Sequence, residues 1–309
     1  MPAARLRFAT LDVFTDRIFT GNRLAVLADA RDEAGAALAV AAMQAIAAEF
    51  GFSETAFVLP SRRPDCARRL RIFTPATELP FAGHPIVGTA VALARDGTLP
   101  MAGDRLDFGF DLEAGPVPVV VRRGRRGLTA EFTAPQLPQV GIASEVEAVA
   151  RALRLPAAAV DAAAHPPSDI GTGLGFVAVR LTDLDALAAA APDRASLRTL
   201  PSPSARHGVV AYVPVEGEVD LRVRVFVPEM GIDEDPATGS AAAALAGFLA
   251  GLNPAEGCRR FRIAQGIEMG RPSRIDAAVE VVGGLVAAVR IGGAAVPVSD
   301  GWLHLPGAA

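Results

Sequence analysis

Short runs of β-branched and aromatic residues recur along the chain, each bounded by Gly, Pro, Asn or Asp. Such runs predict β-strands, because these side chains suit a pleated, half-buried surface. We expect strands at Phe8–Phe14, Leu24–Leu27, Thr55–Leu59, Arg69–Phe73, Leu106–Phe110, Val117–Val121, Leu128–Phe132, Val209–Val213, Leu221–Val227, Val279–Val282, Leu285–Ile291 and Ala294–Val298.

Helical patterns are fewer. The segment Ala34–Phe50 is rich in Ala and places apolar residues at helical spacing, which predicts an amphipathic helix. Further helices are expected at Ile86–Ala94, Ser144–Leu153, Asp183–Ala190 and Ala241–Ala250. Many strand runs with few helices predict an α+β fold with a mostly antiparallel sheet.

The pattern occurs twice. Arg71–Pro75 returns 153 residues later as Arg224–Pro228, and each copy is followed by a short acidic loop and a Gly turn that opens a small-residue helix. The glycines of these turns are Gly83 and Gly239. Further matches keep the same order at offsets of 151 to 156 residues, which indicates a duplication. The alternative is that any two strand–turn–helix units look alike.

The chain length and one Pro-rich stretch suggest where the copies divide. A chain of 309 residues suits one large or two medium domains. Ala134–Pro138 is the best boundary, so we predict an N-terminal domain over 1–138 and a C-terminal domain over 139–309. The last strand, at about 299–306, could pack back on the first domain.

Composition narrows the class of protein. The net charge of −4 argues against a nucleic-acid partner, which would need a basic face. Two cysteines do not make a disulfide framework and fit a reducing compartment. No apolar stretch reaches the ~20 residues of a membrane span, and the N-terminus has no signal-peptide pattern. These features predict a cytoplasmic protein without a membrane partner.

The chain contains no lysine: all 30 basic residues are Arg. Schiff-base chemistry with pyridoxal phosphate or a keto substrate, and a Walker-type phosphate site, are therefore excluded. His165, His207 and His304 are scattered in loops and near the terminus, without metal-ligand spacing. We expect His165-Pro166-Pro167-Ser168 to be a surface loop, and we predict neither a metal nor a cofactor.

The two Gly turns are candidates for anion binding. A helix N-terminus presents backbone N–H groups without intrahelical partners and about half a positive charge. Gly83 in one copy, with Gly239 and Ser240 in the other, could therefore bind carboxylate or enolate oxygens of a small anionic substrate. Taken singly, each turn is a plain helix start; as a matched pair beside acidic loops, they favour a site.

Glu54 is the candidate acid/base. It stands directly before an apolar strand, and alignment of the two copies puts Gly208 opposite it. A carboxylate that breaks the repeat is expected of a residue kept for chemistry, and apolar neighbours can raise its pKa toward neutrality. The alternative is a solvent-exposed Glu at a strand edge.

Two more residues adjoin the turns. His84 follows Gly83, and an imidazole at a helix N-terminus tends to stay neutral and can donate to an oxyanion; the alternative is a capping or surface His. Asp235 could cap the second helix or orient the substrate, and capping is the commoner role.

Other motifs fit other enzyme classes less well. Gly171–Gly175 resembles a dinucleotide loop, but its spacing is wrong and a strand, not a helix, is expected after it. Ser240 lacks the Gly-x-Ser-x-Gly elbow of a serine hydrolase. Cys66 and Cys258 are not at the Gly turns, where a two-thiol racemase would need them.

Several signatures, in order along essentially the whole chain, resemble the PhzF-like family, which is named for an isomerase of phenazine biosynthesis. They are Leu11–Thr15 with Gly21-Asn22, Ser53-Glu54-Thr55, Arg71–Pro85, Glu234–Ala241, Gln265-Gly266 with Met269–Ser273, and Val296 after Gly-Gly-x-Ala. The chain departs from the family pattern at Arg23, where Pro is usual, and at Ile86-Val87.

The resemblance implies a diaminopimelate-epimerase-like fold: two pseudo-symmetric domains, each a curled sheet around a central helix, with the site in the cleft. It also implies that Glu54 shuttles a proton while His84 and Asp235 assist. Members often dimerise, so a homodimer is one expected state.

Three functions stay open on the sequence. The first is a cofactor-independent isomerase that moves a proton on a small carboxylate-bearing substrate. The second is a non-catalytic small-anion-binding protein on the same scaffold, and the third, least favoured, is a racemase or epimerase.

Overall fold

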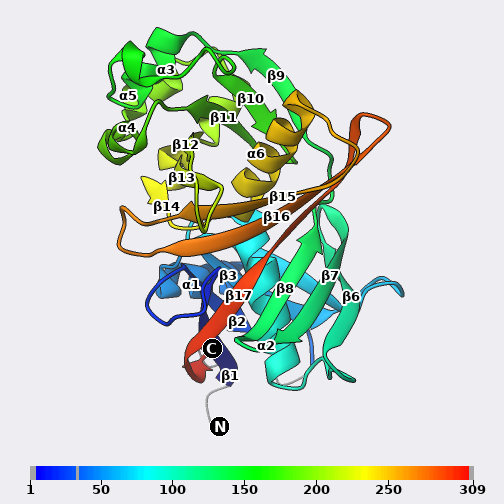
Figure 1. Cartoon of the computed structure of the whole chain (residues 1–309). Coiled ribbons are helices and arrows are strands. Elements are labelled where there is room, and N and C mark those ends of the chain that lie inside the picture. Colours follow the sequence, from blue (N-terminus) through cyan, green and yellow to red (C-terminus); the bar gives the residue numbers. More distant parts are fainter. Residues whose placement is uncertain (1–4, 33–34, 306–309) are drawn as a thin grey trace. The chain divides into compact units, whose positions relative to one another are not determined.

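The computed structural model describes residues 5–32 and 35–305 of the chain. The chain divides into two compact units (Figure 1). Unit 1 consists of Met1–Thr133 and Gly292–Ala309, and unit 2 consists of Ala134–Ile291. No helix within the described ranges is long and apolar enough to cross a membrane.

Unit 1 is built from strands and two helices. Its strands are β1 (Arg5–Val13), β2 (Asn22–Leu27), β3 (Glu54–Pro60), β4 (Arg68–Phe73), β5 (Glu78–Leu79), β6 (Arg105–Leu112), β7 (Gly115–Gly124) and β8 (Gly127–Thr133). Its helices are α1 (Val40–Phe50) and α2 (Gly83–Arg95). The sheet is mixed, because β2–β3 and β4–β6 pair parallel while β1–β2, β3–β4, β6–β7 and β7–β8 pair antiparallel.

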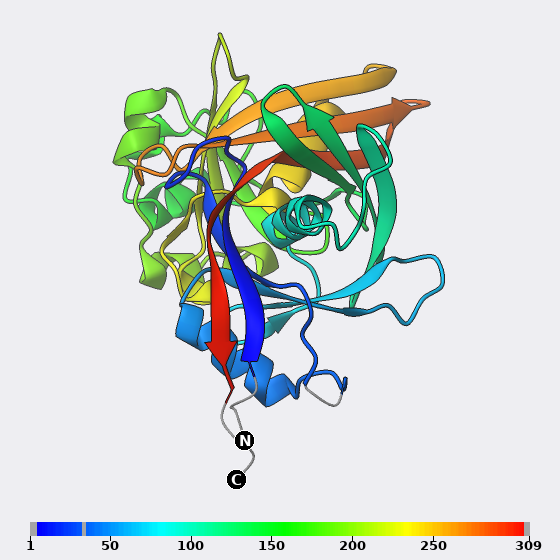
Figure 2. The same cartoon turned by 90° about the horizontal axis from the view of Figure 1, so that it is seen from below.

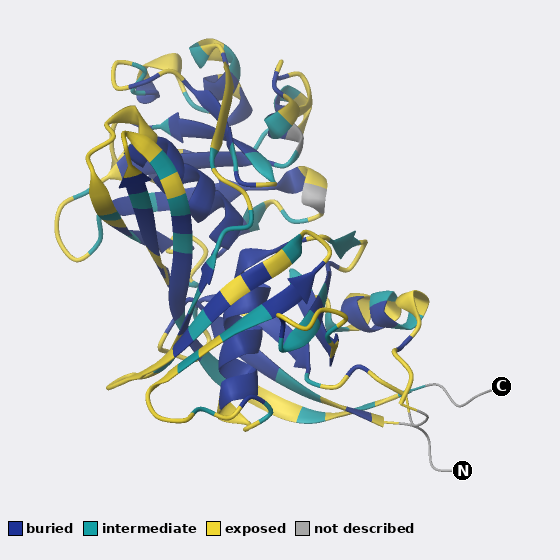
Figure 3. Ribbon diagram, turned by 90° about the vertical axis from the view of Figure 1, so that its right-hand side faces the viewer, coloured by how far each residue is buried: buried dark blue, intermediate teal, exposed yellow. Residues whose placement is uncertain are grey.

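Helix α2 is the centre of unit 1. Residues Gly83 to Ala94 are all buried. Figure 2 shows α2 nearly end-on among the strands, and Figure 3 shows it from the side, buried along its length. A Cβ added at Gly88 would lie 2.5 Å from Leu24 Cδ2 and 2.7 Å from Val13 Cγ2. Glycine is therefore what lets the helix approach β1 and β2 this closely. On another face of the sheet, Met43 and Ile46 of α1 pack against Phe57 and Phe73.

Unit 2 uses the same kinds of element. Its strands are β9 (Gln139–Ala143), β10 (Ser168–Gly171), β11 (Gly175–Arg180), β12 (Val209–Pro214), β13 (Leu221–Phe226), β14 (Glu234–Asp235), β15 (Gly257–Gln265) and β16 (Ser273–Val282). Its α-helices are α3 (Val146–Ala152), α4 (Leu184–Ala189), α5 (Arg194–Arg198) and α6 (Gly239–Leu252), with 3-10 turns η1 (Ala157–Ala159), η2 (Pro203–Arg206) and η3 (Pro228–Met230).

The strand pairings of unit 2 follow those of unit 1. The pairs β11–β12 and β13–β15 are parallel, while β10–β11, β12–β13 and β15–β16 are antiparallel. Helix α6 is buried from Gly239 to Phe248, as α2 is in unit 1. The shorter helices α3, α4 and α5 pack on β11 and β12 through a cluster that includes Val149, Leu187 and Leu197.

Strand β17 (Leu285–His304) begins in unit 2 and ends in unit 1. Its last part pairs antiparallel with β1, from Ala295↔Val13 to His304↔Arg5, and the two strands run side by side in Figure 2. The two strands predicted at Leu285–Ile291 and Ala294–Val298 are therefore one. The Gly292-Gly293 pair that separates them in sequence continues the strand, and a Cβ at Gly292 would lie 2.9 Å from the Ala130 carbonyl oxygen.

The predicted helix Ala34–Phe50 is shorter than expected. Helix α1 starts at Val40, and Ala34 itself lies outside the described residues. Before the helix, Asp32 organises a tight turn in which the Ala36 N–H donates to Asp32 Oδ1 and the Gly35 N–H donates to the Asp32 carbonyl oxygen. This turn, with Gly35 at a φ of +80°, outweighs the helix propensity of the alanines.

Candidate active site

Glu54 is the first residue of β3, and the parallel pairing with β2 places it beside Leu24. Its side chain is 13% exposed, so it is not the exposed strand-edge Glu of the alternative interpretation. Its Oε2 atom lies 3.4 Å from Nε2 of His84. The sequence-predicted Glu54 and His84 are thus brought together inside unit 1.

His84 is the second residue of α2 and is 3% exposed. Burial lowers the pKa of His84 to about 3, and a hydrogen bond with the Arg23 backbone opposes this shift in part. The imidazole is therefore neutral near pH 7, as the sequence predicted, although burial is the larger cause. A neutral imidazole carries one N–H donor and one lone pair.

Two residues that sequence reasoning did not assign to the site complete this cluster. Ser53 Oγ donates to Asn22 Oδ1 at 2.9 Å, and Asn22 Nδ2 lies 3.3 Å from His84 Nδ1. Asn22 is 1% exposed. Their only sequence signal was their place in the Gly-Asn and Ser-Glu-Thr signatures, because Asn22 and His84 are 62 residues apart.

Asp235 ends β14 in unit 2 and is 7% exposed. The Thr238 hydroxyl donates to Asp235 Oδ2 at 2.5 Å. Gln265 fixes both residues: its Nε2 donates to the Asp235 carbonyl oxygen at 2.7 Å and to Thr238 Oγ1 at 3.0 Å, and its Oε1 accepts from the Thr238 N–H. Gln265 was also missed as a site residue, since its partners come from a loop some 30 residues away.

The two Gly turns open buried helices, as predicted. Gly83 is the first residue of α2 and Gly239 the first of α6. The N-cap residues, Ala82 and Thr238, provide no side-chain cap for either helix. Each first turn therefore presents backbone N–H groups with no N-cap side chain to satisfy them.

In each unit, an Arg–Glu ion pair of the same geometry fixes the acidic loop before the central helix. Arg71 donates through Nε and Nη2 to both carboxylate oxygens of Glu78, at 2.7 and 2.5 Å. In unit 2, Arg224 donates in the same way to Glu234, at 2.9 and 2.7 Å. Each guanidinium also lies over a Phe two residues on: Phe73 at 5.2 Å and Phe226 at 4.8 Å. Such bidentate pairs fix geometry as well as charge.

Strand register shows which positions of the two copies correspond. Thr55 pairs with Phe73 in unit 1, and Val209 pairs with Phe226 in unit 2. Glu54 directly precedes Thr55, and Gly208 directly precedes Val209, so Glu54 and Gly208 occupy corresponding positions. Gly208 has a φ of +146°, and a Cβ there would clash with the Phe226 carbonyl oxygen. Unit 2 has no room for a carboxylate at this position.

The other two candidates also lack a matching partner in the repeat. Phe73 pairs with Glu78 and Ile72 with Leu79, while Phe226 pairs with Glu234 and Val225 with Asp235. Asp235 therefore corresponds to Leu79. His84 and Ser240 are each the second residue of the central helix, so they correspond as well.

The chain matches a known protein family along most of its length. The sequence profile of the family described as phenazine biosynthesis-like protein matches residues 11–301. The chain belongs to this phenazine biosynthesis-like family. The predicted family resemblance is thereby confirmed.

Two relatives of this family member are named as isomerases. An uncharacterized isomerase of Mesorhizobium japonicum is 40% identical over 303 residues, which cover 95% of this chain and 97% of the relative. The trans-2,3-dihydro-3-hydroxyanthranilate isomerase of Pseudomonas aeruginosa is 32% identical over 97% of this chain and 99% of its own. The chain is accordingly an isomerase of the phenazine biosynthesis-like family.

Solved structures agree with this assignment. A phenazine biosynthesis protein of Bacillus anthracis matches with a TM-score of 0.87 and 25% identity, over 97% of this chain and 99% of that one. A probable proline racemase of Agrobacterium radiobacter matches with a TM-score of 0.66 and 13% identity, over 97% and 93%, and shows a shared fold alone. These neighbours fit the predicted diaminopimelate-epimerase-like fold.

Other predicted features of the phenazine biosynthesis-like chain fall outside the two clusters. His165 is buried rather than part of a surface loop, because its Nε2 bonds the Tyr212 hydroxyl at 2.6 Å and its ring stacks on that of Tyr212. Among the described residues, no group of three His, Cys, Asp or Glu could hold a metal ion. The Gly171–Gly175 turn leads into strand β11, as expected.

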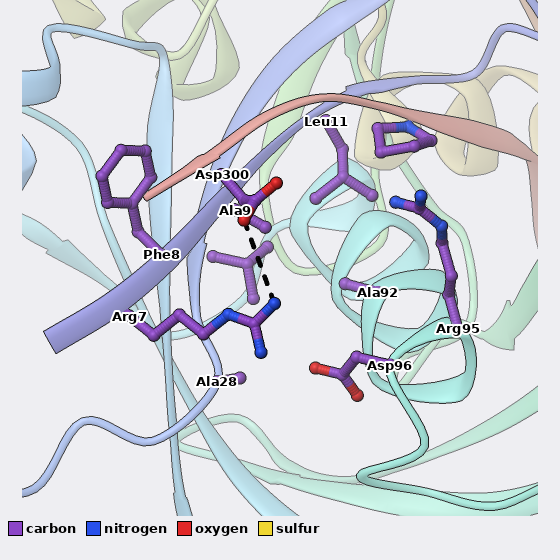
Figure 4. A pocket seen from close by; sticks show the side chains of 11 residues that line it. Arg7, Phe8, Ala9, Leu11, Ala28, Ala92, Arg95, Asp96 and Asp300 are labelled. Atoms are coloured by element: carbon purple, nitrogen blue, oxygen red, sulfur yellow. Dashed lines mark ion pairs between the residues drawn. The ribbon is translucent and has the colours of Figure 1, made fainter. Parts of the chain in front are cut away.

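A cavity of about 260 Å³ in unit 1 lies away from these residues (Figure 4). Its lining includes Arg95 and Asp96, at the C-terminal end of α2, together with Arg7 and Asp300 of β1 and β17. His84 begins the same helix, and 11 residues of helix separate it from Arg95 by about 17 Å. This cavity is therefore not the candidate active site.

Proposed function

We propose that this family member is a cofactor-independent isomerase that moves one proton on a small carboxylate-bearing substrate, with Glu54 as its acid/base. One observation supports the proposal most directly: Glu54 Oε2 lies 3.4 Å from Nε2 of His84, whose buried imidazole is neutral. A buried carboxylate beside a neutral donor suits proton transfer to and from carbon.

The reaction is an allylic shift. The Glu54 carboxylate takes a proton from a carbon next to a double bond, and the C–H electrons form a new double bond while the old π electrons move one carbon further. The Glu54 carboxylic acid exchanges this proton with solvent and then protonates that far carbon, so the carboxylate is regenerated. The anion formed in between is delocalised toward the substrate carboxylate, so no external oxidant or reductant is needed.

The remaining predicted residues receive supporting roles. Nε2 of His84 lies within reach of the Glu54 carboxylate and would polarise it or the substrate. Backbone N–H groups at Gly83, and at Gly239 and Ser240, would bind negative oxygens of the substrate. Asp235, held by Thr238 and Gln265, would orient the substrate.

The repeat supports an asymmetric mechanism. A two-base racemase needs an acid/base on each face of the reacting carbon. The position that corresponds to Glu54 is Gly208, where a side chain would meet the Phe226 carbonyl oxygen. We therefore assign one carboxylate that removes a proton from one carbon and delivers a proton to the other, in preference to racemisation or epimerisation by two bases.

We also propose that units 1 and 2 are the two repeat-related domains of the diaminopimelate-epimerase-like fold. The support is the shared order of parallel and antiparallel pairs and the buried helix in each unit. In this assignment the end of β17 belongs to the first domain through its pairing with β1.

Hydrogen exchange tests the function. The first probe is trans-2,3-dihydro-3-hydroxyanthranilate, the compound in the name of the Pseudomonas aeruginosa relative, followed by other small unsaturated carboxylic acids. Incubation in deuterium oxide should place label on the shifted carbon, and Glu54→Gln should abolish it. The matched control is Glu49→Gln at an exposed position of α1, which should exchange normally.

The non-catalytic alternative predicts a different pattern. An anion-binding protein would bind one of these acids without exchanging its hydrogens, and Glu54→Gln would leave the binding unchanged. Calorimetric titration of both forms with the same acids separates the two functions.

A further inference from the structure

The hydrogen bonds around His84 have a direction. Ser53 is the donor to Asn22 Oδ1, because a carbonyl oxygen can only accept. That contact leaves the amide nitrogen of Asn22, which can only donate, facing His84 Nδ1 at 3.3 Å. An imidazole nitrogen that accepts from an amide must carry a lone pair.

A neutral imidazole with a lone pair on Nδ1 holds its proton on Nε2. Nε2 is the atom that lies 3.4 Å from Glu54 Oε2. In this tautomer the Nε2–H group of His84 faces the Glu54 carboxylate. In the other tautomer, the lone pair of Nε2 would face the lone pairs of the carboxylate oxygen. We infer that Asn22, oriented by Ser53, is a positioning residue that holds His84 in the tautomer protonated on Nε2.

The catalytic consequence rests on the proposed function. A donor at Nε2 stabilises Glu54 as a carboxylate, the form that accepts the proton from carbon. With the proton on Nδ1, the imidazole would oppose that form. Asn22 would therefore act on the reaction through His84, without touching the substrate.

A hydrogen bond to the backbone of Arg23 could instead favour the opposite tautomer. The backbone of Arg23 also hydrogen-bonds to His84, and an N–H directed at that carbonyl from Nδ1 would be the opposite tautomer. In that case the Asn22 amide would be turned, with its oxygen toward the imidazole. The two arrangements place the proton on different nitrogens, which can be observed directly.

The test is nitrogen NMR of the full chain labelled with ¹⁵N-histidine at pH 7. The chain has 4 histidines, and His84→Gln identifies the His84 signals by their loss. The wild type should show Nε2 as a protonated nitrogen and Nδ1 as a lone-pair nitrogen. The reverse pattern in the wild type would overturn the inference.

Variants test the part played by Asn22. Asn22→Asp replaces the donor by an acceptor and should move the proton toward Nδ1. Ser53→Ala removes the hydroxyl that donates to Asn22 Oδ1 and should give a mixture of the two tautomers. Gln44→Glu is the matched control, because Gln44 is an amide of unit 1 that donates to the Thr74 carbonyl oxygen instead. An unchanged tautomer in both Asn22→Asp and Ser53→Ala would contradict the role.

Kinetics then separate positioning from binding. With any acid that the wild type isomerises, Asn22→Asp should lower kcat by about 10²-fold and change KM little. The NMR result does not depend on turnover. Loss of the predicted tautomer would therefore reject the positioning role alone, whereas absent exchange with the tautomer intact would reject the proposed function.

Discussion

At the scale of single residues, the side chains proposed for chemistry stand where the two copies of the repeat differ. Glu54 corresponds to Gly208, Asp235 to Leu79, and His84 to Ser240, as the strand registers and helix starts show. The residues that hold the fold are instead repeated, such as the Arg–Glu pairs. The repeated positions carry the frame, and each unit carries a different part of the proposed chemistry.

Burial of His84 has a measurable effect on stability. Its pKa is about 3 when folded and about 6.5 when unfolded, so between these values the unfolded chain binds one more proton. The free energy of unfolding should therefore fall as the pH drops through this window, by up to about 1.4 kcal/mol per pH unit. Above pH 6.5 the imidazole is neutral in both the folded and the unfolded chain, so the linkage removes no stability there.

Urea unfolding of the wild type and His84→Gln at pH 7 and pH 5 checks this effect. The wild type should lose about 2 kcal/mol more than the variant over this interval. Equal losses would show that His84 does not stay neutral in the folded chain.

The sequence placed Glu54 and His84 in one predicted site but missed the residues that support them. Glu54 was recognisable because a carboxylate stood before an apolar strand without a counterpart in the repeat. Asn22, Ser53 and Gln265 are common polar residues whose partners lie far away in sequence, so only the folded chain shows what they hold.

At the scale of elements, the predicted strands were found, because β-branched runs between turn formers mark strands well. Strands β9, β10 and β15 were not predicted. Two other errors arose where a contact outweighed a local pattern. The Asp32 turn delays α1, and the pairing of β17 carries it through two glycines that would ordinarily end a strand.

Gly88 tests how closely α2 packs on the sheet. Gly88→Ala should destabilise the protein by about 1–3 kcal/mol, because its Cβ would meet Leu24 and Val13. Gly251→Ala in α6 is the control: nothing lies within 4 Å of its Cβ, so it should be neutral or stabilise by up to about 1 kcal/mol. Equal shifts in the urea midpoints would contradict the close approach.

The Arg–Glu pairs test what fixes the acidic loops. Arg224→Met should lower stability by about 3–5 kcal/mol, because the mostly buried Glu234 is left unpaired and the carbonyl oxygens of Leu187, Ala188 and Ala190 lose their donor. Arg63→Met breaks the exposed pair with Asp65, which solvent screens, and should leave stability nearly unchanged. Thermal unfolding compares the two, and similar losses would refute a special role for Arg224.

At the scale of the whole molecule, the last strand, β17, pairs with the first strand, β1. Strand β1 pairs on one side with β2 and on the other with β17, so removing residues 292–309 would leave β1 as an open edge. We expect a chain that stops at Ile291 to unfold at lower urea concentration and to aggregate. A chain that stops at Leu305 keeps the full register with β1 and should behave as the wild type.

The family assignment and the isomerase class hold for the whole chain, since the relatives match it almost from end to end. The domain boundary at residue 138, the homodimer and the cytoplasmic location stay predictions. The proposed anion-binding groups are backbone N–H groups, which accept any carboxylate.

The central claim is that Glu54 alone carries the proton. The most direct measurement is mass and proton NMR analysis of an isomerised acid after reaction in deuterium oxide, with wild type, Glu54→Gln and Glu49→Gln. The account predicts label at the shifted carbon for the wild type and Glu49→Gln, and none for Glu54→Gln. Undiminished labelling by Glu54→Gln would contradict it.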